Sequence, residues 1–480
     1  MLFNSIEFAF FLPVIFVLYW FVFKRNLRLQ NFLILTASYV FYGWWDWRFL
    51  FLLTFSSVID YFVAQELHSS HNERKRKRLL WLSLCVNLGL LGTFKYFNFF
   101  AESFADAFTL LGRPLDPVRL NIILPVGISF YTFQTLSYTI DVYRQKLTPT
   151  KDPVAFFAFV SFFPQLVAGP IERATNLLPQ FYKKRQFDYS NAVNGLRQIL
   201  WGLVKKIVIA DNCAEFANQI FNSSDQYSGS VLVLGAIFFT FQIYGDFSGY
   251  SDIAIGTSRL FGFDLMKNFA FPYFSRDIAE FWRRWHISLS TWFRDYLYIP
   301  LGGSKVSLTK KIRNTFLIFL VSGFWHGANW TFVFWGALNA IYFLPLLLLK
   351  RNRKNTSIIA ENSMFPSVKE LLSVLFTFGL TVFAWIFFRA ESLSHAFSYI
   401  KGIAHRSVFQ MPSVFPKVLV VILVAFILVE WIGRGREFAL DLLNERINKP
   451  LRWTVYLGLL LVIYFLGNHK GEIEFIYFQF

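Results

Sequence analysis

Apolar segments of about 20 residues recur along most of this chain, and a helix of that length spans the hydrocarbon core of a bilayer. The composition points the same way, because 55% of the residues are hydrophobic and 20% are aromatic. A soluble protein of 480 residues would need far more polar surface. The sequence therefore predicts an all-helical integral membrane protein that crosses the bilayer many times.

Basic residues interrupt the apolar segments in short runs. A formal net charge of +17 could suggest a nucleic-acid partner, but this spacing is typical of cytoplasmic loops under the positive-inside rule. We therefore expect membrane lipids and no nucleic acid among the partners. The runs are Lys24-Arg25, Arg74 to Arg78, Lys183 to Arg185, Lys310-Lys311 and Lys350-Arg351.

The segments predict individual membrane helices. Residues 6–23, 31–42, 49–66 and 79–100 are expected to cross, the first as a retained helix rather than a signal peptide. Proline and glycine in residues 121–143 and 153–168 indicate broken or re-entrant helices. Further candidates are residues 196–221, 231–262, 314–349 (one or two passes), 369–389, 416–432 and 453–467. We expect about 10–12 crossings in one domain over residues 1–480, with a catalytic core at about 121–349.

The stretch from Asp277 to Trp335 combines histidine, arginine and tryptophan. Its first part predicts a helix that begins after Asp277, in a capping-box pattern with Glu280, and ends before Pro300. One face is an aromatic stripe in which His286 is the only ionisable residue. The stripe contains Trp282, Trp285, His286, Leu289, Trp292, Phe293 and Tyr296, and the remaining surface carries Arg283, Arg284, Ser288, Arg294 and Asp295.

His326 lies in a second apolar segment, between Gly323 and Gly327. These glycines leave a notch where another helix or a ligand can approach closely. The histidine could serve only as a hydrogen bond between helices, but the notch and the nearby Asn329 favour catalysis. A buried, neutral imidazole can take a proton from a hydroxyl and return it to a leaving group. His286 is a second candidate, with a structural role as its alternative.

Other polar residues have two interpretations each. Arg283 and Arg284 could hold phosphate or carboxylate groups of a donor, or anchor the helix to lipid headgroups. Gln242 and Asp246 suggest a kink lined by polar groups, and Asp246 and Asp252 could instead cap broken helices. The proline-bounded turn from Pro164 to Arg173 is more typical of architecture than of a site.

Familiar catalytic motifs are missing from the sequence. It contains no Ser nucleophile elbow, no P-loop and no His-Glu-x-x-His. The histidines have no third ligand nearby, and Cys85 and Cys213 are far apart, so we expect no metal site and no tightly bound cofactor.

Blocks of residues in order along the chain resemble the membrane-bound O-acyltransferase (MBOAT) family. The resemblance is greatest to its bacterial alginate O-acetyltransferase branch (AlgI-like), to which the D-alanyl-lipoteichoic acid exporter DltB is related. The blocks are Phe162 to Glu172, Asp246 to Asp252, Phe281 to Ser290 and Phe324 to Gly327, with Met1 to Ser5 and Phe475 to Phe480 at the ends.

The resemblance implies a ring of tilted helices around a central funnel. It implies that His326 is the active-site residue and His286 a second important position. Family members move an acyl group from a cytoplasmic thioester, here expected to be acetyl-CoA or an acyl-carrier thioester, to an acceptor reached from the opposite face. In the alginate branch this implies a periplasmic or membrane-anchored acetyltransferase partner and an exported polysaccharide.

The sequence therefore predicts an O-acyltransferase of the bacterial inner membrane that acetylates an alginate-like envelope polysaccharide. His326 would act as general base, His286 would assist, and a tryptophan-lined channel would exclude water. The rival interpretation is a transporter or flippase of polysaccharide or acyl carrier, although no internal repeat supports it. A scaffold for another transferase is a third. The expected channel residues are Trp285, Arg283, Arg284, Ser288, Asp295, Trp325, Asn329, Gln242 and Asp246.

Overall fold

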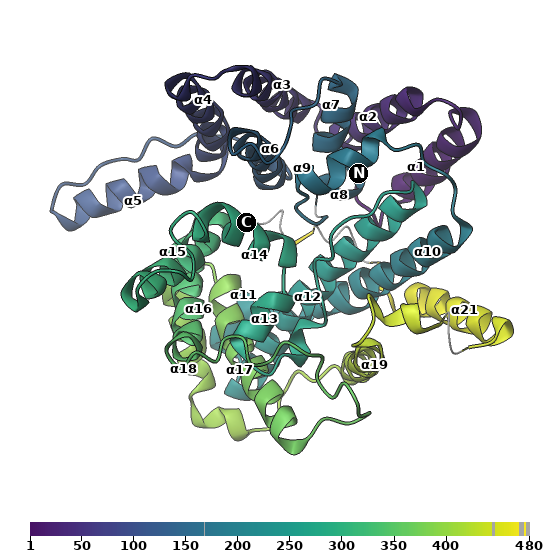
Figure 1. The fold of residues 1–480 in the computed structure, drawn as a ribbon. Helices are drawn as coiled ribbons and strands as arrows, with labels where there is room; N and C mark the ends of the chain where they lie inside the picture. The colour runs from purple at the N-terminus through teal and green to yellow at the C-terminus, as the bar shows by residue number, and fades with distance from the viewer. Residues whose placement is uncertain (168, 444–446, 470–474, 477–480) are drawn as a thin grey trace. The chain divides into compact units, whose positions relative to one another are not determined.

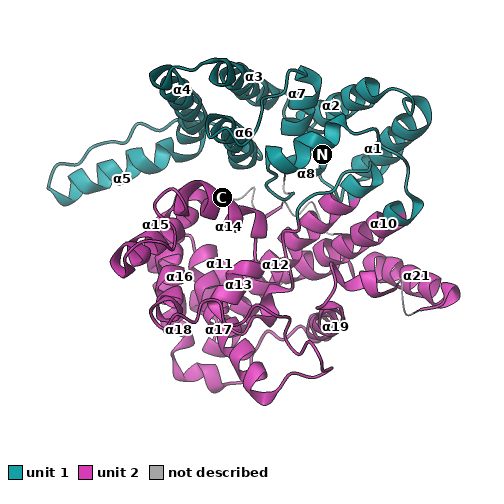
Figure 2. Cartoon of the chain, in the orientation of Figure 1, with its two compact units in different colours: residues 1–192, 257–266 teal, residues 193–256, 267–480 magenta. Residues whose placement is uncertain are grey.

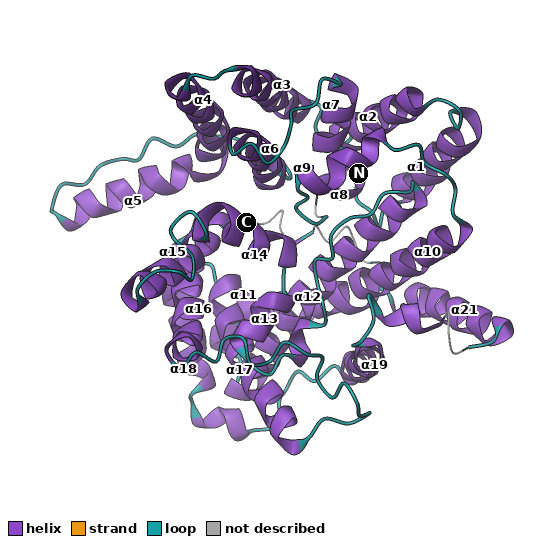
Figure 3. Cartoon of the chain, in the orientation of Figure 1, coloured by secondary structure: helices purple, strands orange, loops and turns teal. Residues whose placement is uncertain are grey.

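The computed structural model describes residues 1–167, 169–443, 447–469 and 475–476. Within these residues all regular secondary structure is helical and there is no strand (Figure 3), which confirms the all-helical prediction. The chain forms two compact units (Figure 2). Unit 1 comprises residues 1–192 and 257–266, and unit 2 comprises residues 193–256 and 267–480.

Six helices in the described part are long and apolar enough to cross a membrane. They confirm a multi-pass membrane protein, whereas the total of about 10–12 crossings and the ring arrangement stay predictions. The six are α3 (Arg48–Ser69), the continuous helix Glu73–Leu110 that contains α4 and α5, α12 (Gly229–Leu260), α16 (Trp330–Leu348), α17 (Val368–Arg389) and α21 (Lys449–Leu466). Ile6–Val22 and Pro153–Leu166 are shorter apolar helices.

Unit 1 is organised around buried hydrogen bonds between its helices. In its core α3 packs against α4 and α6, and α2 packs against α7 (Figure 1). The Asp60 carboxylate of α3 accepts hydrogen bonds from Ser83 Oγ at 2.5 Å and Asn87 Nδ2 at 2.8 Å. Since lipid offers no partner to a polar group, these bonds fix how the helices face one another. The other helices of unit 1 are α1 (Ile6–Val17), α2 (Leu27–Gly43), α4 (Glu73–Leu91), α5 (Phe97–Leu110), α6 (Ile128–Tyr143), α7 (Pro153–Ser161), α8 (Phe163–Leu166) and α9 (Ala174–Leu177).

The expected breaks in the proline-rich part of unit 1 are present. Helix α6 begins only at Ile128, after Gly127 in the left-handed region at φ 74°. A Cβ at Gly127 would lie 2.7 Å from the Leu166 carbonyl oxygen, so only glycine fits this approach. Between α7 and α8 the chain bends at Phe162, and the Phe163 N–H donates to Ser38 Oγ at 3.0 Å.

Unit 2 contains the second half of the chain. Its helices are α10 (Tyr189–Leu203, which starts in unit 1), a π-helical segment (Val204–Ala210), α11 (Asp211–Asn222), most of α12, α13 (Ile278–Arg284), α14 (Ile287–Phe293), α15 (Leu308–His326), α16, α17, α18 (Leu393–Ile403), α19 (Lys417–Gly433) and α21. Helix α18 was not predicted, because it is short. Helices α15 and α16 lie side by side and α17 packs against α16 (Figure 1), so residues 314–349 form two helices rather than one.

Helix α12 runs unbroken through residues 242–252, so the interpretation of Asp246 and Asp252 as caps of broken helices was wrong. Asp252 and Asp246 pair instead with buried lysines of the preceding π-helical segment. Lys205 Nζ lies 3.0 Å from Asp252, and Lys206 Nζ lies 2.9 Å from Asp246. A satisfied ion pair removes the need to break the helix.

Glycines allow α12 to approach α10 at this point. A Cβ at Gly249 would lie 2.8 Å from the Gly202 carbonyl oxygen, whereas a Cβ at Gly379 in α17 would meet no atom within 4 Å. Gly249→Ala should therefore lower the thermal stability of the detergent-solubilised protein, by about 1–3 kcal/mol for an overpacked contact. Gly379→Ala, the control, should leave it unchanged or slightly raise it. Heating followed by size-exclusion chromatography would measure both, and equal effects would refute the close contact.

Candidate functional site

The predicted continuous helix after Asp277 is interrupted at the histidine. Helix α13 ends at Arg284, Trp285 is extended, and His286 adopts the left-handed conformation with φ 43° and ψ 56°. Residues after α12 occupy the gap: Ala270 N–H donates to the Arg284 carbonyl, and Ile287 N–H donates to the Asn268 carbonyl, both at 2.9 Å. The prediction of a single helix after Asp277 was wrong, because these hydrogen bonds to residues 268 and 270 replace the ones that a continuous helix would form. The break turns His286 into the core, where it is 1% exposed.

Asn268 fixes the tautomer of His286. The Asn268 side-chain oxygen lies 3.0 Å from His286 Nδ1 and also accepts from the Ser288 backbone N–H at 3.3 Å and Ser288 Oγ at 2.9 Å. A backbone N–H can only donate, so the shared Asn268 atom is an acceptor and Nδ1 carries the hydrogen. The amide nitrogen of Asn268 donates in turn to Ser251 Oγ at 3.1 Å. The lone pair of a neutral His286 is therefore on Nε2.

Burial keeps this ring neutral. Removal from solvent lowers the pKa of the His286 imidazole to about 3, because the charged form loses its hydration. Phe247 contacts the ring edge-on, with centroids 4.6 Å apart. At physiological pH His286 can accept a hydrogen bond at Nε2 but has little tendency to hold a proton.

His326 is the last residue of α15 and lies close to His286. The centroids of the two imidazoles are 6.5 Å apart, and Trp325 is 5.0 Å from His326 and 6.0 Å from His286. Trp335 and Phe388 close other sides of the His326 ring, at 5.2 and 5.3 Å. The structure thus brings together both histidines proposed from the sequence, buried inside an aromatic enclosure.

The glycine notch beside His326 is filled by protein. A Cβ at Gly323 would lie 2.2 Å from the Phe332 carbonyl oxygen, and one at Gly327 would lie 2.1 Å from the Phe332 ring. Helix α16 is therefore the neighbour that the notch admits. Asn329 caps this helix, accepting from the Thr331 N–H at 3.0 Å and donating to the Glu391 carbonyl at 2.9 Å.

Arg283 and Arg284 face the loop that follows α16. Arg283 donates to the carbonyls of Asn352 and Asn355 at 2.8 and 2.7 Å. Arg284 pairs with Glu280 at 2.8 Å and also donates to the Ser357 carbonyl. Both guanidinium groups thus connect α13 to this loop.

The remaining predicted channel residues lie in different surroundings. Trp285 is fully buried, its ring centroid 5.1 Å from Trp385 and 5.0 Å from Phe269. Asp295 forms an ion pair with Arg294 at 2.7 Å on a partly exposed surface. Gln242 is buried on α12, in the same helix as Asp246.

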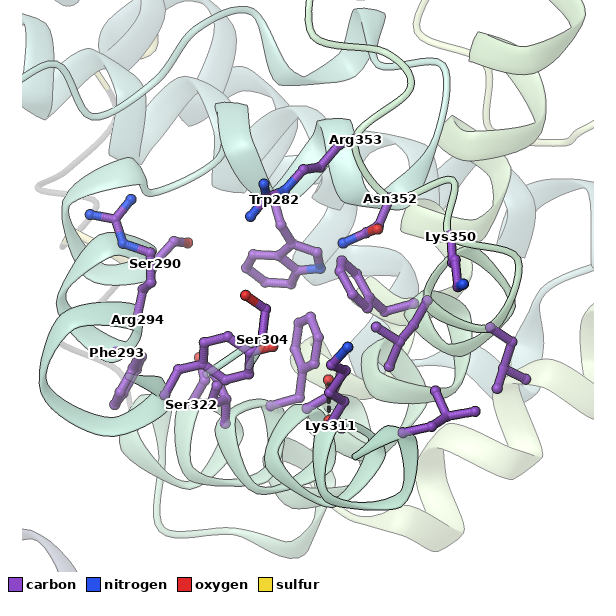
Figure 4. Close-up of a pocket in the computed structure, with 18 of the residues that line it drawn as sticks. Trp282, Ser290, Phe293, Arg294, Ser304, Lys311, Ser322, Lys350, Asn352 and Arg353 are labelled. Carbon is purple, nitrogen blue, oxygen red and sulfur yellow. Dashed lines mark hydrogen bonds between the residues drawn. The ribbon is translucent and has the colours of Figure 1, made fainter. Parts of the chain in front are cut away.

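A cavity of about 700 Å³ opens beside this enclosure. Figure 4 shows the Trp282 indole across its middle, with cationic side chains around it. Arg294, Lys311, Lys350 and Arg353 are among its lining residues, and no described lining residue is acidic. The Trp282 ring packs against Trp335 at 5.6 Å, and Trp335 contacts His326, so a chain of indoles connects the cavity to the histidine.

The sequence did not predict a role in the site for several of these residues. Asn268 stands in a loop with no motif around it, and only its contact with His286 gives it a role. Lys311 and Lys350 were interpreted only as cytoplasmic charges, because the positive-inside rule explained them fully. Trp335 and Trp385 belong to apolar helices, where an indole is unremarkable in sequence.

Comparisons with known proteins identify the family to which the chain belongs. Residues 144–388 match the membrane-bound O-acyltransferase family. A Pseudomonas aeruginosa protein named probable alginate O-acetylase AlgI is 43% identical over 399 residues, covering 82% of this chain and 73% of that protein. Peptidoglycan O-acetyltransferase of Helicobacter pylori is 38% identical over 431 residues, covering 84% and 79%. Teichoic acid D-alanyltransferase of Bacillus subtilis is 27% identical over 290 residues, covering 57% and 71%.

The matched region contains both histidines, Asn268 and the whole cationic rim of the cavity. The resemblance inferred from the sequence blocks is confirmed, including the more distant relation to D-alanyl transfer. The chain belongs to the membrane-bound O-acyltransferase family and is an O-acyltransferase, an enzyme that transfers an acyl group to a hydroxyl.

Proposed function

We propose that this enzyme transfers acetyl groups from acetyl-CoA to a hydroxyl that serves an exported, alginate-like polysaccharide of the cell envelope. The observation that carries the proposal is the pair of imidazoles, 6.5 Å apart, in an aromatic enclosure next to a cationic cavity. The relatives named for alginate and peptidoglycan acetylation support the acetyl group and the polymer class. Their bacterial origin supports the inner membrane as the location.

The histidines divide the chemistry between them. His326 removes the hydroxyl proton while the oxygen attacks the acetyl carbonyl carbon. The carbon–sulfur bond then breaks, and His326 returns the proton to the leaving thiolate. The centroid separation is too long for a direct hydrogen bond between the rings and leaves room for an acceptor oxygen between them. His286 accepts a hydrogen bond at Nε2 and orients the reacting group.

The cationic cavity is the proposed donor site. Its volume falls within the roughly 300–1,000 Å³ of small-molecule and cofactor pockets. Lys311, Lys350 and Arg353 surround it, and the Trp282 indole N–H is buried without a hydrogen-bond partner among the described residues. Several cations suit the three phosphates of coenzyme A better than the single phosphate of a carrier-bound pantetheine arm. The basic runs at 310–311 and 350–351 support access from the cytoplasm.

The acceptor is proposed to reach the site from the opposite face. Acetylation of a polymer outside the membrane then requires a periplasmic or membrane-anchored acetyltransferase that takes over the acetyl group. The aromatic enclosure supports this order of events, because it keeps water away from the thioester.

His326→Ala should lower acetyl transfer by about 10²–10⁴-fold, since that is the usual contribution of general-base catalysis. Acetyl content of the polymer and single-turnover kinetics with labelled acetyl-CoA would measure the loss. Membrane insertion should be unaffected, and His405→Ala, an exposed histidine, is the matched control. Undiminished acetyl content in the His326 variant would refute the assignment.

Asn268→Ala should lower kcat by about 10–100-fold, because a residue that orients a functional histidine carries effects of that size. The KM for the donor should stay within twofold. Asn268→Asp, which keeps an acceptor oxygen opposite Nδ1, should retain more activity than the alanine variant. Equal loss in both variants would indicate that Asn268 acts through packing alone.

Lys311→Ala and Lys350→Ala should each raise the KM for acetyl-CoA about tenfold, the equivalent of about 1.4 kcal/mol. Their effect with acetyl-pantetheine, which lacks the nucleotide phosphates, should be small. Lys401→Ala changes an exposed lysine on α18 and is the control. An unchanged KM for acetyl-CoA, together with activity only on an acyl-carrier thioester, would reassign the donor.

The transporter interpretation predicts a different result from reconstituted protein. Vesicles given labelled acetyl-CoA on one side and a small hydroxyl compound as direct acceptor on the other should yield labelled ester in that acceptor. A transporter or a scaffold would leave the acceptor unmodified.

A further inference from the structure

Two residues near the end of the chain are buried in the core of unit 2. Phe475 is 0% exposed and Ile476 is 1% exposed, although α21 before them is largely exposed. The Phe475 ring contacts Tyr250 at 4.4 Å and Phe247 at 6.0 Å. Both contacts belong to one face of α12, so this short segment is packed on that helix.

The Asp246 carboxylate holds the segment in place. The Ile476 backbone N–H donates to Asp246 Oδ2 at 2.7 Å, while Lys206 Nζ lies 2.9 Å from Asp246 Oδ1. Lys206 also pairs with Asp211 at 2.8 Å, and all three ionisable side chains are buried. A hydrogen bond to a charged acceptor is about twice as strong as a neutral one. The carboxylate therefore holds the described pair Phe475–Ile476 against α12.

Phe247 connects the latched segment to the active site. Its ring lies edge-on to His286 at 4.6 Å and also contacts Phe475 at 6.0 Å. It also packs against Phe269 at 4.9 Å, next to Asn268 in the chain. Removing the Phe475 ring would leave a cavity behind Phe247, and the surrounding side chains would relax into it. His286 would then lose the wall that keeps its ring fixed.

We propose that the C-terminal segment is a positioning element of the active site, latched by Asp246 and acting on His286 through Phe475 and Phe247. The kinetic part of this inference rests on the proposed acetyl transfer. The latch itself does not rest on acetyl transfer, because the chemical accessibility of residue 476 can test it separately.

Accessibility of the segment tests the latch directly. In a Cys85→Ala background, which removes the exposed native cysteine, Ile476→Cys should react slowly with a maleimide in the folded full-length protein. Adding Asp246→Ala should speed labelling at least tenfold, whereas Asp225→Ala, an exposed acid, should not. Equally fast labelling with and without Asp246 would overturn the latch.

Kinetics test the positioning role. Phe475→Ala should lower kcat at least tenfold, with the KM for acetyl-CoA within twofold because other residues line the donor cavity. Phe475→Leu should restore most of the rate, and Phe465→Ala, at a position 72% exposed on α21, should have no effect. The double variant Asp246→Ala/Phe475→Ala should be no slower than the slower single variant, because the two residues act as one unit.

The outcomes separate the two proposals. A wild-type kcat in Phe475→Ala, or additive losses in the double variant, would overturn the positioning role. If Phe475→Ala does not elute as a single species in size-exclusion chromatography, Phe475→Met is used in its place, because it leaves a smaller cavity. A wild-type protein that transfers no acetyl group would refute the proposed function, while the labelling rates would still decide the latch.

Discussion

Two consecutive buried lysines of unit 2 pair with carboxylates of α12. Lys205 faces Asp252 at 3.0 Å and Glu430 at 3.5 Å, and Lys206 faces Asp246 and Asp211. An unpaired charge here would cost several kcal/mol, and water is not at hand to relieve it. The π-helical segment 204–210 directs the two side chains to different partners. The pairing therefore fixes α12, and with it the helix face that carries Phe247.

The histidine site is built on that fixed face. Asn268 follows α12 by a short loop, and its backbone and side chain both bind the broken segment at His286. The break interrupts the helical hydrogen bonds at a left-handed residue, which the chain tolerates because the tertiary structure supplies other partners. What it gains is an imidazole directed inward, 6.5 Å from the one at the end of α15. Trp325, Trp335 and Phe388 pack around the imidazole of His326.

The sequence predicted the membrane class, most helix positions and the two histidines, because apolar length and rare polar residues are local signals. It could not predict the break at Trp285 and His286, since the aromatic stripe at helical spacing looked continuous. It also offered Asp246 as the cap of a broken helix, because its partner Lys206 lies 40 positions earlier in the chain. Asn268 had no signal at all. The predictions failed at residues whose conformation depends on a partner distant in sequence rather than on neighbouring residues.

The arginine contacts of α13 have a mechanical consequence. Arg283 and Arg284 together hold carbonyls of Asn352, Asn355 and Ser357, in the loop that also bears Lys350 and Arg353. These hydrogen bonds attach the loop that carries two of the cavity's cationic residues to the helix that leads to His286. The cationic rim and the histidine segment therefore share one hydrogen-bonded support.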